Sequence, residues 1–284
     1  MGCCCQTNKK FNIMKRFFYS LLELMAVTFG ALAFTACGGD DDGGSSSGGG
    51  GGSSSGKGTF MGTKRVYSKA LVSEISIQSE TTRLSYDDNG FLTKVSYVKN
   101  ADNTTYKTAN ITYAENKISV VWIRNNGSSA SMLVNIGSNG FASSGTYTSG
   151  NHSETFAFEY NNANQLSKAK WDGESEVTEF TYTNGDNVIT TVYNNGSLTK
   201  TYNISNSSIS NTFFVMPEFM GADLDDVGEI LGFAGALGYP SAHLLSTRNG
   251  SSIYNFEWAV NSAGIPTQLV CSGITYTFRY IELN

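Results

Sequence analysis

Cysteine, histidine and proline are all scarce in this chain, with five, two and three copies among 284 residues. Three cysteines precede a long apolar run and Cys37 follows it, so only Cys271 remains in the rest of the chain. Once the first three leave with the apolar run and Cys37 is acylated, as argued below, an internal disulfide is excluded. Cys271 stands in an apolar strand context, which favours a buried, inert thiol. The two histidines, His152 and His243, lie in no local motif that would supply it with a catalytic base.

Basic clusters and recognisable catalytic patterns are also lacking. The chain has 19 Lys and Arg against 24 Asp and Glu, a formal net charge of −5. Counted from Cys37 onward, 15 basic and 23 acidic residues leave −8. With no basic patch to meet a phosphate backbone, a nucleic-acid partner is excluded. No metal cluster, nucleotide-binding loop or catalytic motif stands out, so the sequence predicts a non-enzymatic protein without a cofactor or metal ion.

The one long apolar run lies near the N-terminus, from Phe17 to Ala36, and four basic residues precede it: Lys9, Lys10, Lys15 and Arg16. A basic segment, an apolar core and small residues before a cleavage point are typical of a secretory signal. We therefore predict that residues 1–36 are a signal peptide, with Met14 as an alternative start. A run of this length could instead span a bilayer as a helix, which is the other interpretation.

Cys37 directly follows this run. The sequence Phe34-Thr35-Ala36-Cys37 resembles the bacterial lipobox, in which the cysteine after the cut receives a diacylglycerol, although Phe34 stands where leucine is usual. Three acidic residues follow, Asp40 to Asp42, and they resemble the surface-export signal of Bacteroidetes lipoproteins. A solvated charge run is the alternative. We expect lipidation at Cys37 and a lipid-anchored location at the outer membrane, exposed at the cell surface.

A linker separates this anchor from the folded part. Gly43–Gly56 contains only glycine and serine, a composition that behaves as a flexible coil. About 20 residues of this kind span roughly 25 Å end to end. The expected organisation is a signal peptide over 1–36, a lipidated cysteine and linker over 37–57, and a folded domain over 58–284.

The folded part contains a repeated turn pattern. An apolar residue precedes a four-residue turn rich in glycine and asparagine, and the copies begin at Tyr86, Ile136, Tyr160, Tyr182 and Val260, with shorter ones at Tyr113 and Tyr193. Glycine and asparagine tolerate the positive φ that hairpin turns require. Between turns every second residue is apolar or aromatic, as in Phe156-Ala157-Phe158-Glu159-Tyr160, which is the period of a half-buried strand. The sequence predicts an all-β antiparallel meander of roughly 12–14 strands, forming a curled sheet or a barrel.

One segment, near residues 223–238, departs from this pattern and predicts a short helix. Asp223 can serve as the N-cap, with Asp225 and Asp226 in the first turn, where acidic side chains are favourable. Glycine and proline follow at Gly238 and Pro240 and stop the helix. Its apolar residues share one face: Leu224, Val227, Leu231 and Ala234. We expect this helix to cover one end or the mouth of the curled sheet.

These features together resemble a known family. They are the lipobox, the Tyr-Asp-x-x-Gly-x-Leu hairpin at Tyr86, and a closing pattern in which Leu231-Gly232-Phe233-Ala234-Gly235 and His243-Leu244-Leu245 precede Phe256-Glu257-Trp258 and Tyr276-Thr277-Phe278-Arg279-Tyr280. From about Lys64 to Asn284 the chain is similar to the Bacteroidetes lipoproteins grouped as domain of unknown function 4595. The resemblance implies a porin-like fold, but it supplies no catalytic residues and no settled function.

Three acidic groups could carry chemistry, and each has a simpler interpretation. Asp87-Asp88-Asn89-Gly90 offers oxygen ligands for calcium, but the sister turns lack the acids, which favours a plain hairpin turn. The aspartates at 223–226 could hold a cation, but helix capping explains them. The third group lies near Trp171 and could be read as glycosidase carboxylates, although a solvated strand face is favoured: Glu174, Glu176 and Glu179.

Three tryptophans offer flat faces on which sugars stack: Trp122, Trp171 and Trp258. Because most aromatic rings alternate inward on the strands, a place in the core is the default for each. Trp171, beside Asp172-Gly173, is the best placed for a ligand. We therefore expect a surface-held binding or scaffold module for an extracellular ligand such as a glycan or host polymer. A polysaccharide-acting hydrolase and a small pore-like barrel are the alternatives.

Overall fold

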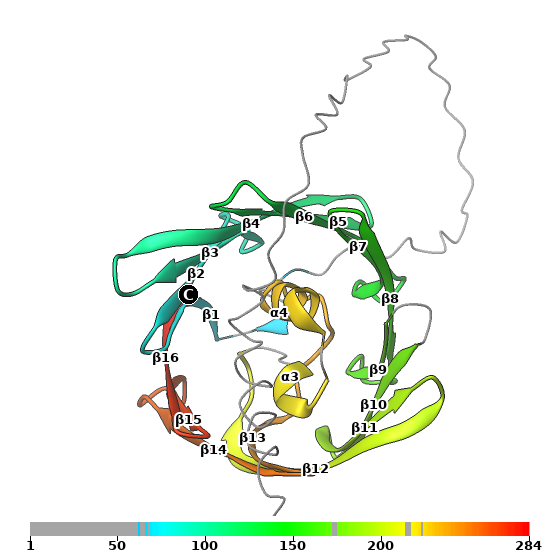
Figure 1. The fold of residues 1–284 in the computed structure, drawn as a ribbon. Coiled ribbons are helices and arrows are strands. Elements are labelled where there is room, and N and C mark those ends of the chain that lie inside the picture. The colour runs from blue at the N-terminus through cyan, green and yellow to red at the C-terminus, as the bar shows by residue number, and fades with distance from the viewer. Residues whose placement is uncertain are drawn as a thin grey trace, which may run out of the picture. The chain divides into compact units, whose positions relative to one another are not determined.

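Each β-strand pairs antiparallel with its sequence neighbours, and the last strand returns to pair with the first. The computed structural model describes residues 62, 66–67, 69–171, 175–213, 217–222 and 224–283 and shows a closed barrel of sixteen strands (Figure 1). The predicted all-β antiparallel meander is confirmed, and a barrel is the shape observed. The strands are β1 Ala70–Ser76, β2 Glu80–Tyr86, β3 Leu92–Lys99, β4 Thr104–Ala114, β5 Lys117–Arg124, β6 Ser129–Ile136, β7 Ala142–Ser149, β8 His152–Tyr160, β9 Leu166–Trp171, β10 Glu176–Thr183, β11 Asp186–Asn194, β12 Ser197–Ser210, β13 His243–Asn249, β14 Ile253–Val260, β15 Pro266–Cys271 and β16 Ile274–Glu282.

The strand number exceeds the predicted 12–14, because the turn pattern in the sequence marks mainly one end of the barrel. We call the first rim the end that carries the turns from each even-numbered strand to the next odd-numbered one, and the second rim the opposite end. Six of the seven recognised turns lie at the first rim, and the turn at Tyr193 joins β11 to β12 at the second rim. The other turns of the second rim have a different composition and escaped the count.

Side chains shape the longer turns of the first rim. At the β2–β3 turn, Oδ1 of Asp87 accepts hydrogen bonds from the backbone N–H groups two and four residues later, at 3.0 and 2.8 Å. Asn161 at the β8–β9 turn and Asn261 at the β14–β15 turn accept the same pair of bonds. These Asx turns replace part of the strand ladder at the bend. Asp87 therefore has a structural role, as the hairpin interpretation of residues 87–90 predicted.

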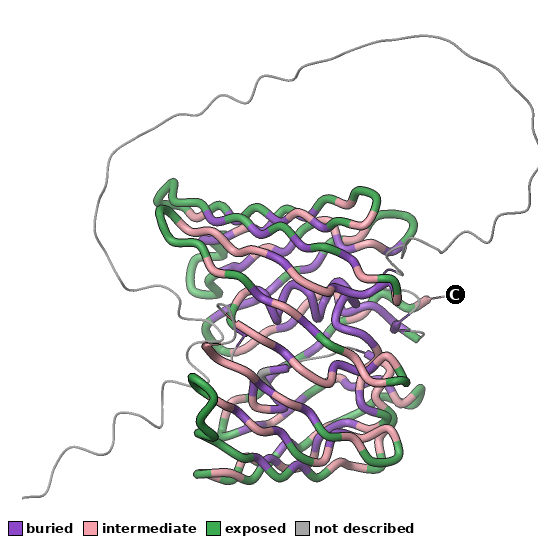
Figure 2. The backbone as a smooth tube through the Cα atoms, turned by 90° about the vertical axis from the view of Figure 1, so that its right-hand side faces the viewer, coloured by how far each residue is buried: buried purple, intermediate pink, exposed green. Residues whose placement is uncertain are grey.

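Alternation along each strand gives the barrel an apolar inside and a polar outside. On β6, Ala130, Met132, Val134 and Ile136 are buried, whereas the alternate residues Ser129, Ser131, Leu133 and Asn135 are exposed. Figure 2 shows this alternation of buried and exposed positions along the strands. Within the described ranges eight large apolar side chains are exposed, and only three of these gather on one outer patch, over β5 and β6: Val121, Ile123 and Leu133. A membrane-spanning barrel carries a continuous apolar band outside, so the polarity here is the reverse.

The connection from β12 to β13 is called the insert, and its described residues, 211–213, 217–222 and 224–242, include two helices that lie in the barrel lumen. It contains α3 (Pro217–Met220) and α4 (Asp225–Phe233), and both lie inside the ring of strands (Figure 1). All residues of α4 from Val227 to Phe233 are buried. A helix buried on every side belongs in a core. The expectation that this helix would cover one end or the mouth of the sheet is therefore wrong, because α4 is buried from Val227 to Phe233 and lies inside the ring of strands.

Helix α4 is shorter than the predicted range 223–238. It begins at Asp225, with Leu224 in the N-cap position and no side-chain capping hydrogen bond, and the predicted cap Asp223 lies outside the described residues. Gly235 ends it with φ 68°, and the next N–H bonds at 2.8 Å to the carbonyl five residues earlier, which is the Schellman arrangement. In the part of the chain that is described, no helix is long and apolar enough to cross a membrane.

Candidate functional site

A buried polar cluster joins the insert to the barrel wall. Lys107 on β4 donates through Nζ to Oδ1 of Asp226 on α4, at 2.6 Å. The hydroxyl of Tyr97 on β3 donates to Oε2 of Glu229 on α4, at 3.2 Å. The Lys107 ammonium also lies 4.6 Å from the centre of the Tyr97 ring, a distance at which the cation and the ring attract each other. The cluster therefore fixes one side of α4 to β3 and β4.

Burial dominates the electrostatics of this cluster. The pKa of Glu229 is raised to about 8, mainly because the group is buried; Asp226 and Glu80 act in the same direction, and Lys107 and the Tyr97 hydroxyl oppose the shift. Burial also raises the pKa of Glu80. At neutral pH Glu229 is thus mainly a protonated carboxyl group. Such a group has the pKa of a general acid, but only 4% of Glu229 is exposed. We assign it a structural role.

The returning limb of the insert docks on the turns of the first rim. The N–H of Ala142 donates to the carbonyl of Ala236 at 2.9 Å, and the N–H of Tyr239 donates to the carbonyl of Asn164 at 2.9 Å. Gln165, only 5% exposed, donates through Nε2 to the carbonyls of Gly185 and Pro240 at 2.7 and 3.0 Å. These bonds hold the limb rigidly across the β6–β7, β8–β9 and β10–β11 turns.

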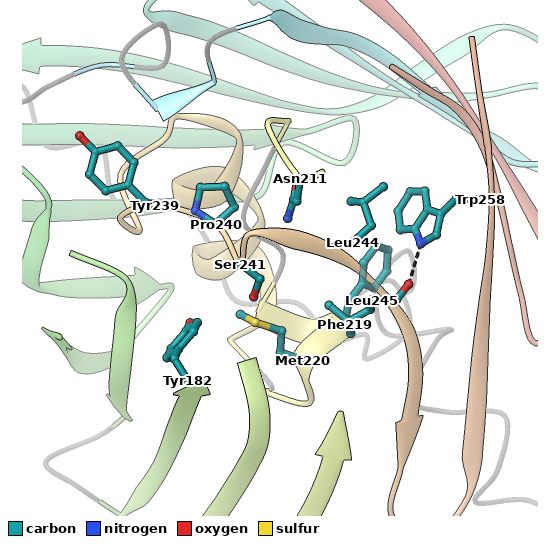
Figure 3. Close-up of a pocket in the computed structure, with 10 residues that line it drawn as sticks. All are labelled: Tyr182, Asn211, Phe219, Met220, Tyr239, Pro240, Ser241, Leu244, Leu245 and Trp258. Carbon is teal, nitrogen blue, oxygen red and sulfur yellow. Dashed lines mark hydrogen bonds between the residues drawn. The ribbon is translucent and has the colours of Figure 1, made fainter. Parts of the chain in front are cut away.

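A hollow opens at the first rim where the insert enters and leaves the barrel, and we call it the rim hollow. The hollow is shallow: the space in it that a water-sized sphere can reach is about 20 Å³, room for one or two water molecules. Figure 3 shows tyrosines on one side, Trp258 on the opposite side, and Ser241 and Met220 between them. All the lining side chains are uncharged: Tyr182, Asn211, Phe219, Met220, Tyr239, Pro240, Ser241, Leu244, Leu245 and Trp258.

Local contacts fix the walls of the rim hollow. Nε1 of Trp258 donates to the carbonyl of Leu245 at 2.8 Å, as the dashed line in Figure 3 marks, and its ring stacks on Phe278 with centroids 6.0 Å apart. Ser241 is 4% exposed, and its hydroxyl oxygen accepts a hydrogen bond from the N–H of Asn187 at 3.3 Å. No single stretch of the sequence indicates this hollow, because its residues come from five separate segments. Of the three tryptophans that the sequence offered for stacking a ligand, Trp258 is the one that lines this hollow.

Trp171, the residue predicted to bind a ligand, lies at the far end of the barrel. It ends β9 at the second rim, pairs with Phe156 of β8, and stacks on that ring with centroids 5.8 Å apart and planes at 15°. Because Phe156 is buried and directly opposite residues share a face, Trp171 faces the lumen. It is half-buried and is not part of the rim hollow. Its neighbours at 172–174 lie outside the described residues, as do Cys37 and the predicted signal peptide and linker.

The glutamates beside Trp171 do not converge. Glu176 and Glu179 are three residues apart on β10 and therefore point to opposite faces. Glu179 pairs on the outside with Lys168, at 2.8 Å. Glu174 lies outside the described residues. The geometry does not bring the two described carboxylates, Glu176 and Glu179, to a common cleft, which a glycosidase would require.

The two histidines each have an acidic partner. Nδ1 of His243 lies 2.9 Å from Oδ2 of Asp186, and the backbone N–H of His243 donates to Oδ1 of the same carboxylate at 2.8 Å. His152 lies 2.9 Å from Glu154. Cys271 is buried, and burial raises its pKa, as expected for an inert thiol. Within the described ranges, no group of three or more metal-binding side chains is found.

The fold defines a closed, filled β-barrel with a polar outer face and a hollow at one rim. The chain belongs to the family described as domain of unknown function (DUF4595) with porin-like fold, which matches residues 84–279. A porin-like protein from Bacteroides uniformis is similar in structure, with TM-score 0.59 and 15% identity over 80% of this chain and 100% of its own. A second, from Bacteroides vulgatus, has TM-score 0.51 and 12% identity over 75% of this chain and 100% of its own. The comparison with curated proteins gave no match.

Proposed function

We propose that this chain is a non-enzymatic binding module, held at the outer surface of the cell by a lipid on Cys37. The observation that carries the proposal is the rim hollow, which is lined by uncharged side chains on a rigid, hydrogen-bonded frame. Small-molecule sites are concave and mainly apolar, with a few polar groups that orient the ligand. A glycan or another extracellular molecule is the expected class of ligand.

Binding is favoured over catalysis because the reactive groups are either dispersed or enclosed. The glutamates of β10 face opposite sides of the wall, and Glu229 is buried against Tyr97. Incubation of the purified protein with polysaccharides should therefore release no reducing ends. Release that is lost on substitution of Glu176 would favour the hydrolase alternative.

Binding is favoured over conduction because the insert occupies the lumen and the outer face is polar. The protein should add no current steps to a planar lipid bilayer, and it should stay monomeric without detergent once its lipid is removed. Current steps would favour the pore-like alternative.

The binding proposal is tested by thermal unfolding of the full chain with a glycan panel and a panel of small uncharged molecules. A ligand that binds only the folded state at 100 times its Kd stabilises it by about 2.7 kcal/mol, enough to raise Tm measurably. If a glycan raises the Tm of the wild type but not that of Trp171→Ala, its binding site lies at the second rim. No stabilisation by any member of either panel would contradict the proposal.

The anchor is tested separately by metabolic labelling with a fatty acid. We expect the label on the wild type and on Cys271→Ser, because that thiol is buried in the barrel. The Cys37→Ser variant should carry none. Label retained in Cys37→Ser would contradict lipidation at this residue.

A further inference from the structure

The outer wall over β4 to β7 differs from the neighbouring wall in charge. Every residue of these four strands is described, and their outward side chains lie on the face opposite to the buried ones. Lys117, at the first rim, is the one charged side chain of these strands that points outward. The outer wall over β8 to β10, in contrast, carries two ion pairs, Lys168 with Glu179 and Lys170 with Glu159.

The centre of this uncharged wall carries the outer patch of three aliphatic side chains. Val121 and Ile123 on β5 are 44% and 51% exposed, and Leu133 on β6 is 44% exposed. The register makes Val121 and Leu133 diagonal neighbours on adjacent strands, about 7–8 Å apart. The residues that pair with these three across the strands are serine, threonine and asparagine. The patch is therefore a small apolar surface framed by uncharged polar groups.

The size of the patch decides what can cover it. Three aliphatic side chains that are about half exposed offer on the order of 100–200 Å² of apolar surface. A stable complex between two proteins buries about 800 Å² on each partner, so this patch does not hold a second copy by itself. A surface to which the chain is already tethered needs only a weak contact, because a tether raises the effective concentration to the millimolar range.

The predicted tether brings such a surface within reach. Gly62 lies against the ring of Phe91 in the β2–β3 turn, since an added Cβ would be 2.7 Å from that ring, and the described chain therefore begins at the first rim. The patch is about three strand spacings around the wall from this turn and about four residues down β5, which together give about 20 Å. The Gly/Ser linker spans roughly 25 Å on average. A lipid on Cys37 thus allows this wall to reach the membrane that holds the chain.

We propose that the outer patch on β5 and β6 rests on the lipid surface of the membrane to which Cys37 anchors the chain. This inference rests on the proposed lipid anchor and names the face of the barrel that meets the bilayer. Aliphatic side chains gain free energy when they leave water at the interface. Because no carboxylate points outward from β4 to β7, this wall does not repel lipid phosphates, although the chain as a whole is acidic.

The test uses the lipidated full chain in phosphatidylcholine vesicles that carry a nitroxide on part of their headgroups. Cys271 is buried and Cys37 holds the lipid, so a cysteine introduced on the outer wall is the thiol that a fluorescent maleimide labels. Ile123→Cys places the label in the patch. Ile189→Cys is the matched control, because Ile189 is 37% exposed on β11, at another side of the ring (Figure 1). We expect the nitroxide to quench the label in the patch several-fold more strongly.

A double substitution in the patch supplies the second readout. Val121→Ser with Leu133→Ser removes the apolar groups beside the label and should lower its quenching to that of the control. Both residues point outward, so the melting curve should stay close to that of the wild type. Equal quenching at the two labelled positions, or unchanged quenching in the double variant, would overturn the inference. An emission shift without vesicles that grows with protein concentration would do so too, because a second copy then covers the patch.

The failure of this inference is distinguishable from that of the proposed anchor. If the chain floats with the vesicles but the two labels are quenched equally, the anchor stands and the inference fails. If the chain carries no lipid and stays out of the floated fraction, the anchor fails and the inference fails with it.

Discussion

Lys107 and Asp226 are 119 residues apart in the sequence, yet they form an ion pair of 2.6 Å between the barrel wall and the helix inside it. The Lys107 side chain is 5% exposed and that of Asp226 is 16% exposed. Two charges held so far from water are stable only as a pair. The contact therefore ties the position of α4 to the integrity of the barrel.

Replacing Lys107 with methionine should destabilise the protein strongly. The substitution leaves the Asp226 carboxylate without its partner in a mostly buried place, and we expect a loss of about 3 kcal/mol in the free energy of unfolding. The matched control is Lys168→Met, which breaks an outer pair whose side chains are 30% and 39% exposed and should cost less than about 1 kcal/mol. Urea denaturation measures both, and equal losses would contradict the assigned role of the inner pair.

Glu229 should make the stability depend on pH. Its pKa is raised from 4.5 to about 8 in the folded protein, so the folded state binds more protons than the unfolded state between these values. The contribution of Glu229 to the free energy of unfolding is therefore most favourable below about pH 4.5. It falls as the pH rises from about 4.5 to about 8. Glu229→Gln removes this loss and should be more stable than the wild type at pH 9, by a few kcal/mol.

The measurement is the difference in unfolding free energy between the two proteins at pH 5 and at pH 9. Comparing them at each pH cancels the titration of the other carboxyl groups. If the difference is equal at pH 5 and at pH 9, Glu229 is ionised in the folded protein at both pH values.

Gly238→Ala should disrupt the docking of the insert. An added Cβ would lie 2.3 Å from the carbonyl oxygen of Asn164 and 2.9 Å from the Tyr160 ring, and that carbonyl is held by a hydrogen bond from the N–H of Tyr239 at 2.9 Å. Gly127 is the matched control, since its φ of 80° is close to the 82° of Gly238 and its Cβ would meet nothing within 4 Å. Gly127→Ala should cost about 1 kcal/mol and Gly238→Ala clearly more. Thermal unfolding compares them, and similar losses would argue against tight docking.

Asn261→Ala should weaken the β14–β15 turn. It removes two hydrogen bonds from backbone N–H groups to Oδ1, at 3.0 and 2.9 Å. At about 0.5–1.5 kcal/mol for each bond, the loss should be about 1–2 kcal/mol, since the turn is solvent-accessible. Asn261→Asp keeps an acceptor oxygen, as Asp87 does in the β2–β3 turn, and should retain most of the stability. A loss in both variants would assign the effect to something other than this acceptor.

Much of the wall of the barrel follows from local patterns in the sequence. Period-two alternation, as around Phe156, fixes which side chains face inward, and the turns at Tyr86 and Val260 fix where strands end. Both signals act within a few residues, so a single sequence contains them in full. The closure of the sheet cannot be predicted from such local signals, because the pairing of Ile75 with Phe278 depends on the accumulated curvature of all the strands.

The candidate site was much less predictable. Trp171 stands out in the sequence as an aromatic beside a turn, yet it stacks on Phe156. The residues of the rim hollow, such as Tyr182 and Ser241, stand in ordinary surroundings and meet only because the insert turns back into the lumen. Asp226 was recognised as a helix-terminal acid, but its partner Lys107 lies on a strand whose sequence gives no sign of the contact.

The pairing of β1 with β16 is a seam that only the complete polypeptide can close. The other fifteen strand pairings all join consecutive strands, and all but β12 with β13, which spans the insert, can form hairpin by hairpin as the chain emerges. A product that stops short of β16 would keep two unpaired sheet edges, at β1 and β15, each able to recruit a strand from another copy. Self-association is therefore the characteristic hazard of incomplete synthesis for this architecture.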